Sequence, residues 1–138
     1  MSDLKQIEWG LETHIAADVT LAATLATYET KPAIFAYTAP EDAVPPYICY
    51  YPLSISADDT YDTRQDDAIF QINVHTFKIS TAYDIYSLLD DLLHRQTFSI
   101  TGYTNLFVKR IRGIGRLQLE EGEEVQGLSA DYKVMVQD

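Results

Sequence analysis

The stretch that decides the fold is PPYICYYPLSISADDTYDTRQDD, from Pro45 to Asp67. Its first half alternates as a β-strand does, so that the odd-numbered side chains of 47–55 share one face and the even-numbered ones share the other. Because Pro52 cannot donate an amide hydrogen, we expect this strand to lie at a sheet edge or to be bulged there. The second half, 57–67, is predicted to be a solvated connection.

A second strand follows directly in AIFQINVHTF, residues 68–77. Its alternation is cleaner than that of the first strand, with apolar side chains facing inward and polar ones facing away. The inward set is Ala68, Phe70, Ile72 and Val74, and the outward set is Gln71, Asn73 and His75. The two strands are therefore predicted to form a long hairpin whose tip is the acidic connection.

Helical patterns flank this hairpin on both sides. Apolar residues at spacings of three and four predict a leading helix, and they are Leu4, Ile7, Leu11 and Ile15. Asp18 is expected to cap a second short helix that runs through Leu25. After the hairpin, STAYDIYSLLDDLLHRQ contains a capping-box pair, Thr81 and Asp84, before an apolar stripe. The stripe consists of Ile85, Leu88, Leu89, Leu92 and Leu93.

The rest of the chain has the patterns of strands and turns. A short strand is expected at 33–37, a strand with glycine breaks at 98–119, and a turn in EEGEE (120–124). SADYKVMV (129–136) is expected to be a closing strand whose inward side chains are Ala130, Tyr132, Val134 and Val136. This order predicts an α+β fold, in which a mostly antiparallel sheet has helices packed on one face. With 138 residues, the chain is expected to form a single domain over 1–138.

Charge and composition narrow the classes of function. The formal net charge of −11 argues against sequence-independent binding of nucleic acid, because phosphate contacts need clustered cations. No apolar run approaches the roughly 20 residues that span a bilayer, so no membrane association is expected. One cysteine permits no internal disulfide. Because the opening residues include Asp3 and Glu8, we expect no signal peptide, and we expect a cytoplasmic protein or one of a particle assembled there.

No catalytic, cofactor-binding or metal-binding site is predicted. Cys49 lies on a strand without the surroundings that activate a thiol, and it is expected to be a small buried hydrophobe. The three histidines, His14, His75 and His94, fall on different elements without metal-ligand spacing. DDTYDTRQDD has neither the glycine nor the glutamate of a calcium-binding EF-hand loop.

Two oppositely charged clusters are the candidate assembly contacts. The acidic cluster consists of Asp58, Asp59, Asp62, Asp66 and Asp67. The basic cluster consists of Lys109, Arg110, Arg112 and Arg116. In a head-to-tail ring, one patch of each subunit meets a different patch of the next, and such charges would set the register of that contact. The alternatives are a solvated strand face for the basic cluster and a solvated tip for the acidic one.

The layout resembles the tail-terminator, or tail-completion, proteins of long-tailed bacteriophages. The resemblance lies in the leading helix, in PYICYYPL after a proline-containing loop, in FQINVHTF, in TAYDIYSLLDDLL, and in the closing DYKVMV. It covers residues 4–136 in the order of elements. The segment VKRIRGIGRLQLEEGEEVQG departs from the family pattern, which leaves the ends of that hairpin open.

This resemblance implies a structural virion protein, assembled in the host cytoplasm and placed where head and tail join. It implies a homo-oligomeric, six-membered ring that caps the tail tube, receives the head connector and lets DNA pass. The family brings no catalytic residues to this chain. Two other classes stay open at this point: an acidic inhibitor that mimics DNA and fills a basic groove on a partner, and a small enzyme whose site the sequence does not reveal.

Overall fold

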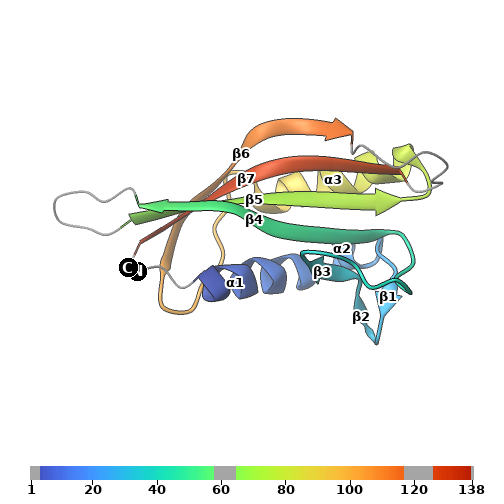
Figure 1. Ribbon diagram of the computed structural model, residues 1–138, viewed down its shortest axis with the longest axis horizontal. Coiled ribbons are helices and arrows are strands. Elements are labelled where there is room, and N and C mark those ends of the chain that lie inside the picture. The colour runs from blue at the N-terminus through green and yellow to red at the C-terminus, as the bar shows by residue number, and fades with distance from the viewer. Residues whose placement is uncertain (1–3, 58–64, 117–125, 138) are drawn as a thin grey trace.

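The computed structural model describes residues 4–57, 65–116 and 126–137. Figure 1 shows the helices and strands of these ranges. In chain order they are α1 (Leu4–Ala16), α2 (Val19–Ala22), β1 (Thr27–Tyr28), β2 (Lys31–Pro32), β3 (Ile34–Ala36), β4 (Tyr47–Ala57), β5 (Gln65–Thr76), α3 (Ile79–Leu93), β6 (Thr104–Arg116) and β7 (Gln126–Gln137).

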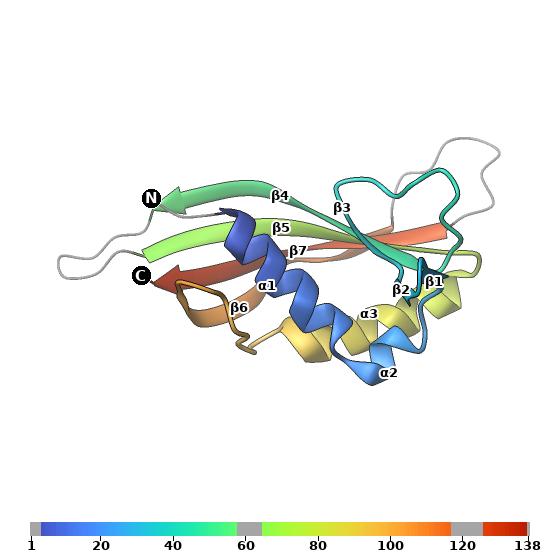
Figure 2. The same ribbon diagram turned by 90° about the horizontal axis from the view of Figure 1, so that it is seen from below.

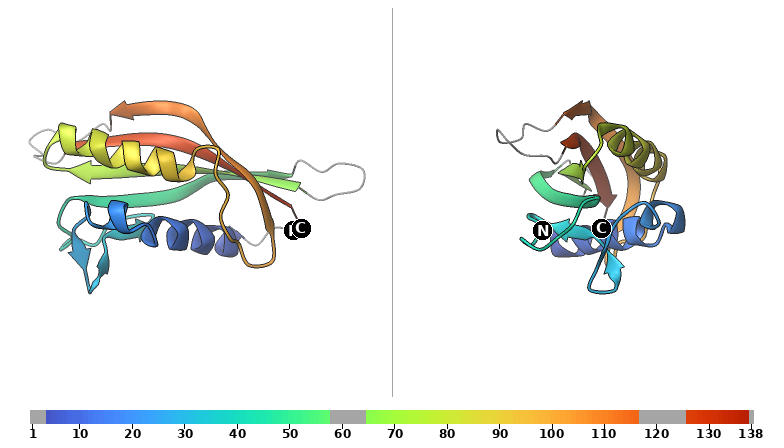
Figure 3. Two further views of the ribbon diagram at one scale, coloured as in Figure 1. Left: turned by 180° about the vertical axis from the view of Figure 1, so that it is seen from behind. Right: turned by 90° about the vertical axis from the view of Figure 1, so that its right-hand side faces the viewer.

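Five strands form one sheet in the order β3-β4-β5-β7-β6, and β1 and β2 form a separate ribbon. All neighbours in the sheet are antiparallel except β3 and β4, which are parallel. α3 packs against β5 and β7, and α1 crosses the strands obliquely (Figure 2). The predicted α+β class with a mostly antiparallel sheet is confirmed. The sheet is curled, as the views in Figure 3 show, and it accounts for more of the chain than the helices do.

The long hairpin predicted from the opening stretch is present as β4 and β5. Its pairing runs from Tyr47 opposite His75 to Ala57 opposite Asp66. The register shifts between Pro52 and Ser54, so the bulge expected at the proline is confirmed. The hairpin continues past the first turn of α1 toward one end of the molecule (Figure 1).

This bulge changes which side chains of β4 face the core. Before it, Ile48 and Tyr50 are buried, and Tyr50 lies opposite the buried Ile72. After it, Ile55 lies opposite Ala68, which belongs to that same inner face. The expectation of one continuous odd-numbered face is therefore wrong, because one extra residue in a strand exchanges its two faces.

The inner faces of the two central strands were predicted correctly. In β5 the buried residues include Ala68, Phe70, Ile72 and Val74, and in β7 they include Ala130, Tyr132, Val134 and Val136. The helices contribute Ile7, Leu11 and Ile15 from α1 and Ile85, Leu89 and Leu93 from α3 to the same cluster. Leu88 and Leu92 are partly buried against it, so the apolar stripe of α3 is confirmed.

Three buried tyrosines place hydroxyl groups inside this core, and each hydroxyl has an acceptor. Tyr86 donates to the carbonyl of Ile72 across the contact between α3 and β5. Tyr132 donates to Asp90 at 2.8 Å, and Tyr50 donates to Glu12 of α1 at 3.1 Å. Burial raises the pKa of all three phenols, so they stay neutral donors. These bonds fix how both helices sit on the sheet.

The helix boundaries differ from the predicted ones in two places. Asp18 caps α2 as expected, accepting from the amide of Leu21 at 3.2 Å, but the helix ends at Ala22 instead of Leu25. α3 begins at Ile79, before the expected capping box. Directly before the helix, the Thr76 hydroxyl donates to the carbonyl of Lys78 at 2.6 Å.

Candidate assembly surfaces

The acidic cluster is divided by the start of β5. Asp58, Asp59 and Asp62 lie outside the described residues, whereas Asp66 and Asp67 are paired in the strand. Asp67 is only 7% exposed, and its carboxylate lies 3.5 Å from the Lys133 ammonium. The predicted connection ran to residue 67 because the run of polar side chains hides the strand pairing that begins at Gln65.

The basic cluster lies on β6, where two of its members are held by carboxylates of the same chain. Arg110 lies 3.1 Å from Asp90, the carboxylate that also accepts from Tyr132. Arg112 donates twice to Asp131, at 3.0 and 3.3 Å, and once to Ser129 at 2.9 Å. Their charge is therefore largely compensated within the subunit.

The other two basic residues differ from these. Lys109 is exposed and has no ion pair with any described residue. The Arg116 side chain is outside what the structure describes. The register places Lys109 and Arg112 on one face, opposite Lys133 and Asp131, because the pairing shifts between Arg110 and Arg112. Arg110 lies opposite Tyr132 on the inner face, so the structure does not bring the basic cluster together on one surface.

The segment after α3 covers part of the outer edge of β6. The amide of Arg95 donates to the Val108 carbonyl at 2.7 Å, and the Val108 amide donates to Gln96 at 3.1 Å. His94 accepts from the Arg110 amide through Nδ1 at 3.0 Å. These bonds use the free backbone groups of an edge strand as far as Arg110.

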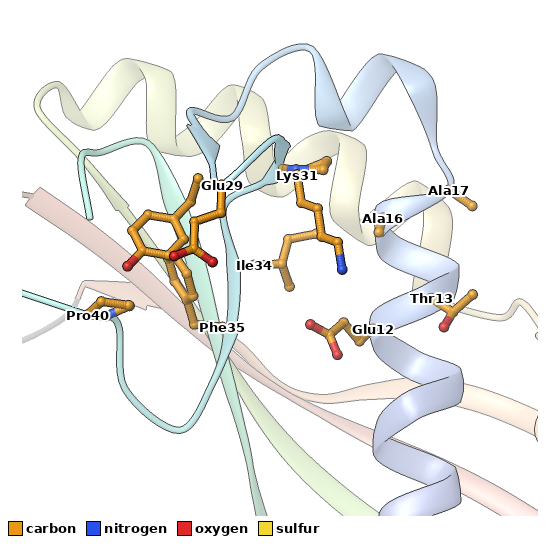
Figure 4. A pocket seen from close by; sticks show the side chains of 11 residues that line it. Glu12, Thr13, Ala16, Ala17, Glu29, Lys31, Ile34, Phe35 and Pro40 are labelled. Atoms are coloured by element: carbon orange, nitrogen blue, oxygen red, sulfur yellow. The ribbon is translucent and has the colours of Figure 1, made fainter. Parts of the chain in front are cut away.

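A hollow of about 700 Å³ opens beside the other edge of the sheet (Figure 4). It lies between α1, the β1–β2 ribbon and β3. Its lining is Glu12, Thr13, Ala16, Ala17, Tyr28, Glu29, Lys31, Pro32, Ile34, Phe35 and Pro40. Sequence reasoning missed this hollow, because its residues come from three separate stretches of the chain and form no motif.

An aromatic row supports the floor of the hollow. Phe35 makes edge contacts with Tyr28 at 5.2 Å and with Tyr47 at 5.9 Å between ring centroids. Tyr47 in turn stacks on His75 at 4.8 Å, and burial lowers the pKa of that imidazole. These ring contacts pack β1, β3, β4 and β5 against one another beside the hollow.

The residues tested for chemistry lie apart from one another. Cys49 is buried as predicted, and burial raises the pKa of its thiol to about 11, which keeps it a protonated, weak nucleophile near neutral pH. His14 stacks on Phe98 at 5.1 Å and lies 3.1 Å from the Leu92 carbonyl. Within the described ranges, no three metal-ligating side chains gather, and no helix is long and apolar enough to cross a membrane.

Comparison with known proteins identifies a matching family and similar solved structures. Residues 21–136 match the family described as bacteriophage tail terminator protein. One similar solved structure is a chain from the virion of a native gene transfer agent particle, with a TM-score of 0.79, 16% identity, and coverage of 96% of this chain and 95% of that one. A second solved chain has a TM-score of 0.56 at 20% identity and covers 97% and 96%. A search of curated proteins gave no match.

At these identities the two solved structures establish the shared fold. The family match begins within α2, ends one residue before the end of β7, and covers every strand of the curled sheet. The chain belongs to the bacteriophage tail terminator protein family and is a structural protein of the virion tail.

Proposed function

We propose that copies of this chain close into a six-membered ring that caps the tail tube, receives the head connector and lets DNA pass. The match of residues 21–136 to the tail terminator family carries this proposal. The fold shared with a chain of a gene transfer agent virion supports it, because that protein is also built into a particle. Tail tube and head connector proteins are the partners, and the protein has no catalytic role.

Each subunit acts in this ring as one domain with its helices on one face of the sheet. One hydrophobic cluster joins residues of α1, α3, β5 and β7, which supports both points. On the opposite face, β5 carries the polar residues Gln71, Asn73 and His75 together with Ile69.

The charge distribution suits a conduit for DNA. A lumen that held free cations would bind phosphate groups and slow the passage of DNA. In this subunit Arg110, Arg112 and Lys133 are each paired with a carboxylate. The same pairs compensate the three carboxylates involved.

The acidic hairpin tip is proposed as an assembly contact of the ring. Asp67 is not available for this contact, because its carboxylate pairs with Lys133. The acidic residues that could make the contact are Asp58, Asp59, Asp62 and the half-buried Asp66. The hairpin leads away from the body, which supports a role in reaching a second protein (Figure 1). Its partner is the basic cluster of the next subunit or a surface of the tail tube.

The test is to purify the whole chain and measure its mass in solution and its appearance by electron microscopy, alone and with tail tubes that lack a terminator. Rings of six that sit on tube ends are expected. A chain that stays monomeric at all concentrations and does not bind tubes would refute the proposal. Tail-tube subunits alone are the control for rings of other origin.

A further inference from the structure

The uncovered part of β6 presents an apolar side chain among cations. Ile111 is 45% exposed and follows Arg110, where the cover from residues 94–96 ends. The register gives Ile111 no partner in β7, since Arg110 pairs with Tyr132 and Arg112 pairs with Asp131. Ile111 is thus the extra residue of a bulge. Bulges commonly redirect a side chain at the edge of a sheet.

The form of this edge argues against simple strand addition. β6 has register shifts on both sides of Arg112. An irregular edge does not offer the evenly spaced amides and carbonyls that another strand needs. A contact made here therefore depends on side chains, with Ile111 at its centre and Lys109 beside it.

The hollow at the opposite edge of the sheet is partly apolar and negatively charged, which complements an exposed isoleucine beside a lysine. Ile34 and Phe35 of β3 supply apolar surface, and the carboxylates of Glu12 and Glu29 line the same space (Figure 4). Lys31 is the one cation among the lining residues, so the hollow carries a net negative charge at neutral pH. Glu12 also accepts from Tyr50, which holds its carboxylate in place.

We propose that Ile111 and Lys109 of one copy dock in the hollow beside β3 of the next copy. This inference rests on the proposed ring and names the contact that closes it. β6 and β3 form opposite edges of one sheet, so pairing them joins unlike surfaces of identical subunits (Figure 1). Such a head-to-tail contact is the kind that generates closed rings.

The occupant is a second copy of this chain, because the charge and polarity of its β6 surface complement those of the hollow. The hollow has apolar and acidic lining residues, and β6 presents an exposed isoleucine two positions from an exposed lysine. A single isoleucine fills only a fraction of about 700 Å³, so the adjoining backbone and the Lys109 stem enter with it. The contact is individually weak, and closure of the ring supplies the rest of the stability.

Disulfide trapping tests this contact. In a Cys49→Ala background, Ile111→Cys and Lys31→Cys are placed in separate chains, mixed, and oxidised with oxidised glutathione. Cross-linked dimers are expected in the mixture and not in either variant alone, and one chain that carries both cysteines should give a ladder that ends at the ring. Phe77→Cys, at 55% exposure, is the matched control in place of Ile111→Cys.

A charge exchange gives an independent measurement without cysteines. Lys109→Glu or Glu29→Lys alone should raise the concentration for half-assembly by roughly tenfold, since each places like charges opposite one another. The two changes together should restore most of the assembly. Circular dichroism and melting temperature, unchanged in each variant, exclude a folding defect.

The outcomes separate the two proposals. If rings form without a cross-link between Ile111→Cys and Lys31→Cys, this contact is overturned and the ring proposal stands. The same holds if the double charge variant assembles no better than the single variants. Failure of the unmodified protein to form rings refutes both. Cross-linking to an added tail-tube protein in place of a second copy also overturns the contact.

Discussion

The two halves of the β4–β5 hairpin differ in what covers them. Before the bulge at Pro52, Ile48 and Tyr50 are completely or almost completely buried. After it, Ile55 is 39% exposed although it lies on the same inner face. The strand sequence is apolar on both sides of the bulge, so the difference comes from the elements packed against it.

This comparison shows what alternation in a strand can and cannot predict. It identifies residues that share a face, and a bulge exchanges that assignment. It does not reveal how far along the face the covering layer reaches. The proximal half is part of the folding core, whereas the exposed Leu53 and Ile55 leave the distal half available to other proteins.

The largest expected effect comes from truncating the proximal half. Ile48→Ala should lower the free energy of unfolding by about 2–5 kcal/mol, because the side chain is fully buried and leaves a cavity. Ile55→Ala is the matched control on the same strand and face, and it should cost well under half as much. Urea denaturation measures both. Equal losses would show that the two halves are buried alike.

A smaller effect is expected from the hydroxyl that ties the proximal half to α1. Tyr50→Phe should lower the free energy of unfolding by about 1 kcal/mol, because it removes the hydroxyl that donates to Glu12 and keeps the packing of the aromatic side chain. Tyr51→Phe, one residue along on the opposite face, should change stability by less than about 0.5 kcal/mol. Thermal unfolding of both variants compares them. A neutral Tyr50→Phe would mean that this bond contributes nothing.

The ion pair of the distal half should contribute less still. Asp67→Asn removes the partner of Lys133 and should cost up to about 1 kcal/mol, an effect reduced by high salt. Asp66→Asn is the neighbouring control, since no described cation pairs with Asp66, and it should be nearly neutral. Melting temperatures at low and high salt decide whether the two aspartates differ.

The smallest effect on folding is expected at the hairpin tip. Replacing Asp58, Asp59, Asp62 and Asp66 together with Asn should leave the melting temperature nearly unchanged. Ring formation or attachment to tail tubes should fall, most clearly at low salt, because several weak charge contacts are lost together. If assembly is unchanged at every salt concentration, the tip is only a solvated turn.

Much of the fold could be predicted from local patterns. Alternation identified the inner faces of β5 and β7, and helical spacing identified the buried faces of α1 and α3. The hairpin and the bulge at Pro52 also followed from residue types, because a proline cannot donate to its neighbour. The parallel pairing of β3 with β4 could not be predicted in this way, since the two strands are joined by a loop of irregular structure.

The pairing and exposure of the candidate assembly residues could be predicted far less well, because they depend on tertiary contacts. Sequence alone determined where charge is concentrated and which residues were candidates for assembly. Only the folded chain decided that Asp67 pairs with Lys133, that Arg110 and Arg112 are compensated by Asp90 and Asp131, and that Ile111 is exposed. The physical reason is that burial and ion pairing are set by residues distant in the chain, whereas alternation, capping and proline geometry act between neighbours.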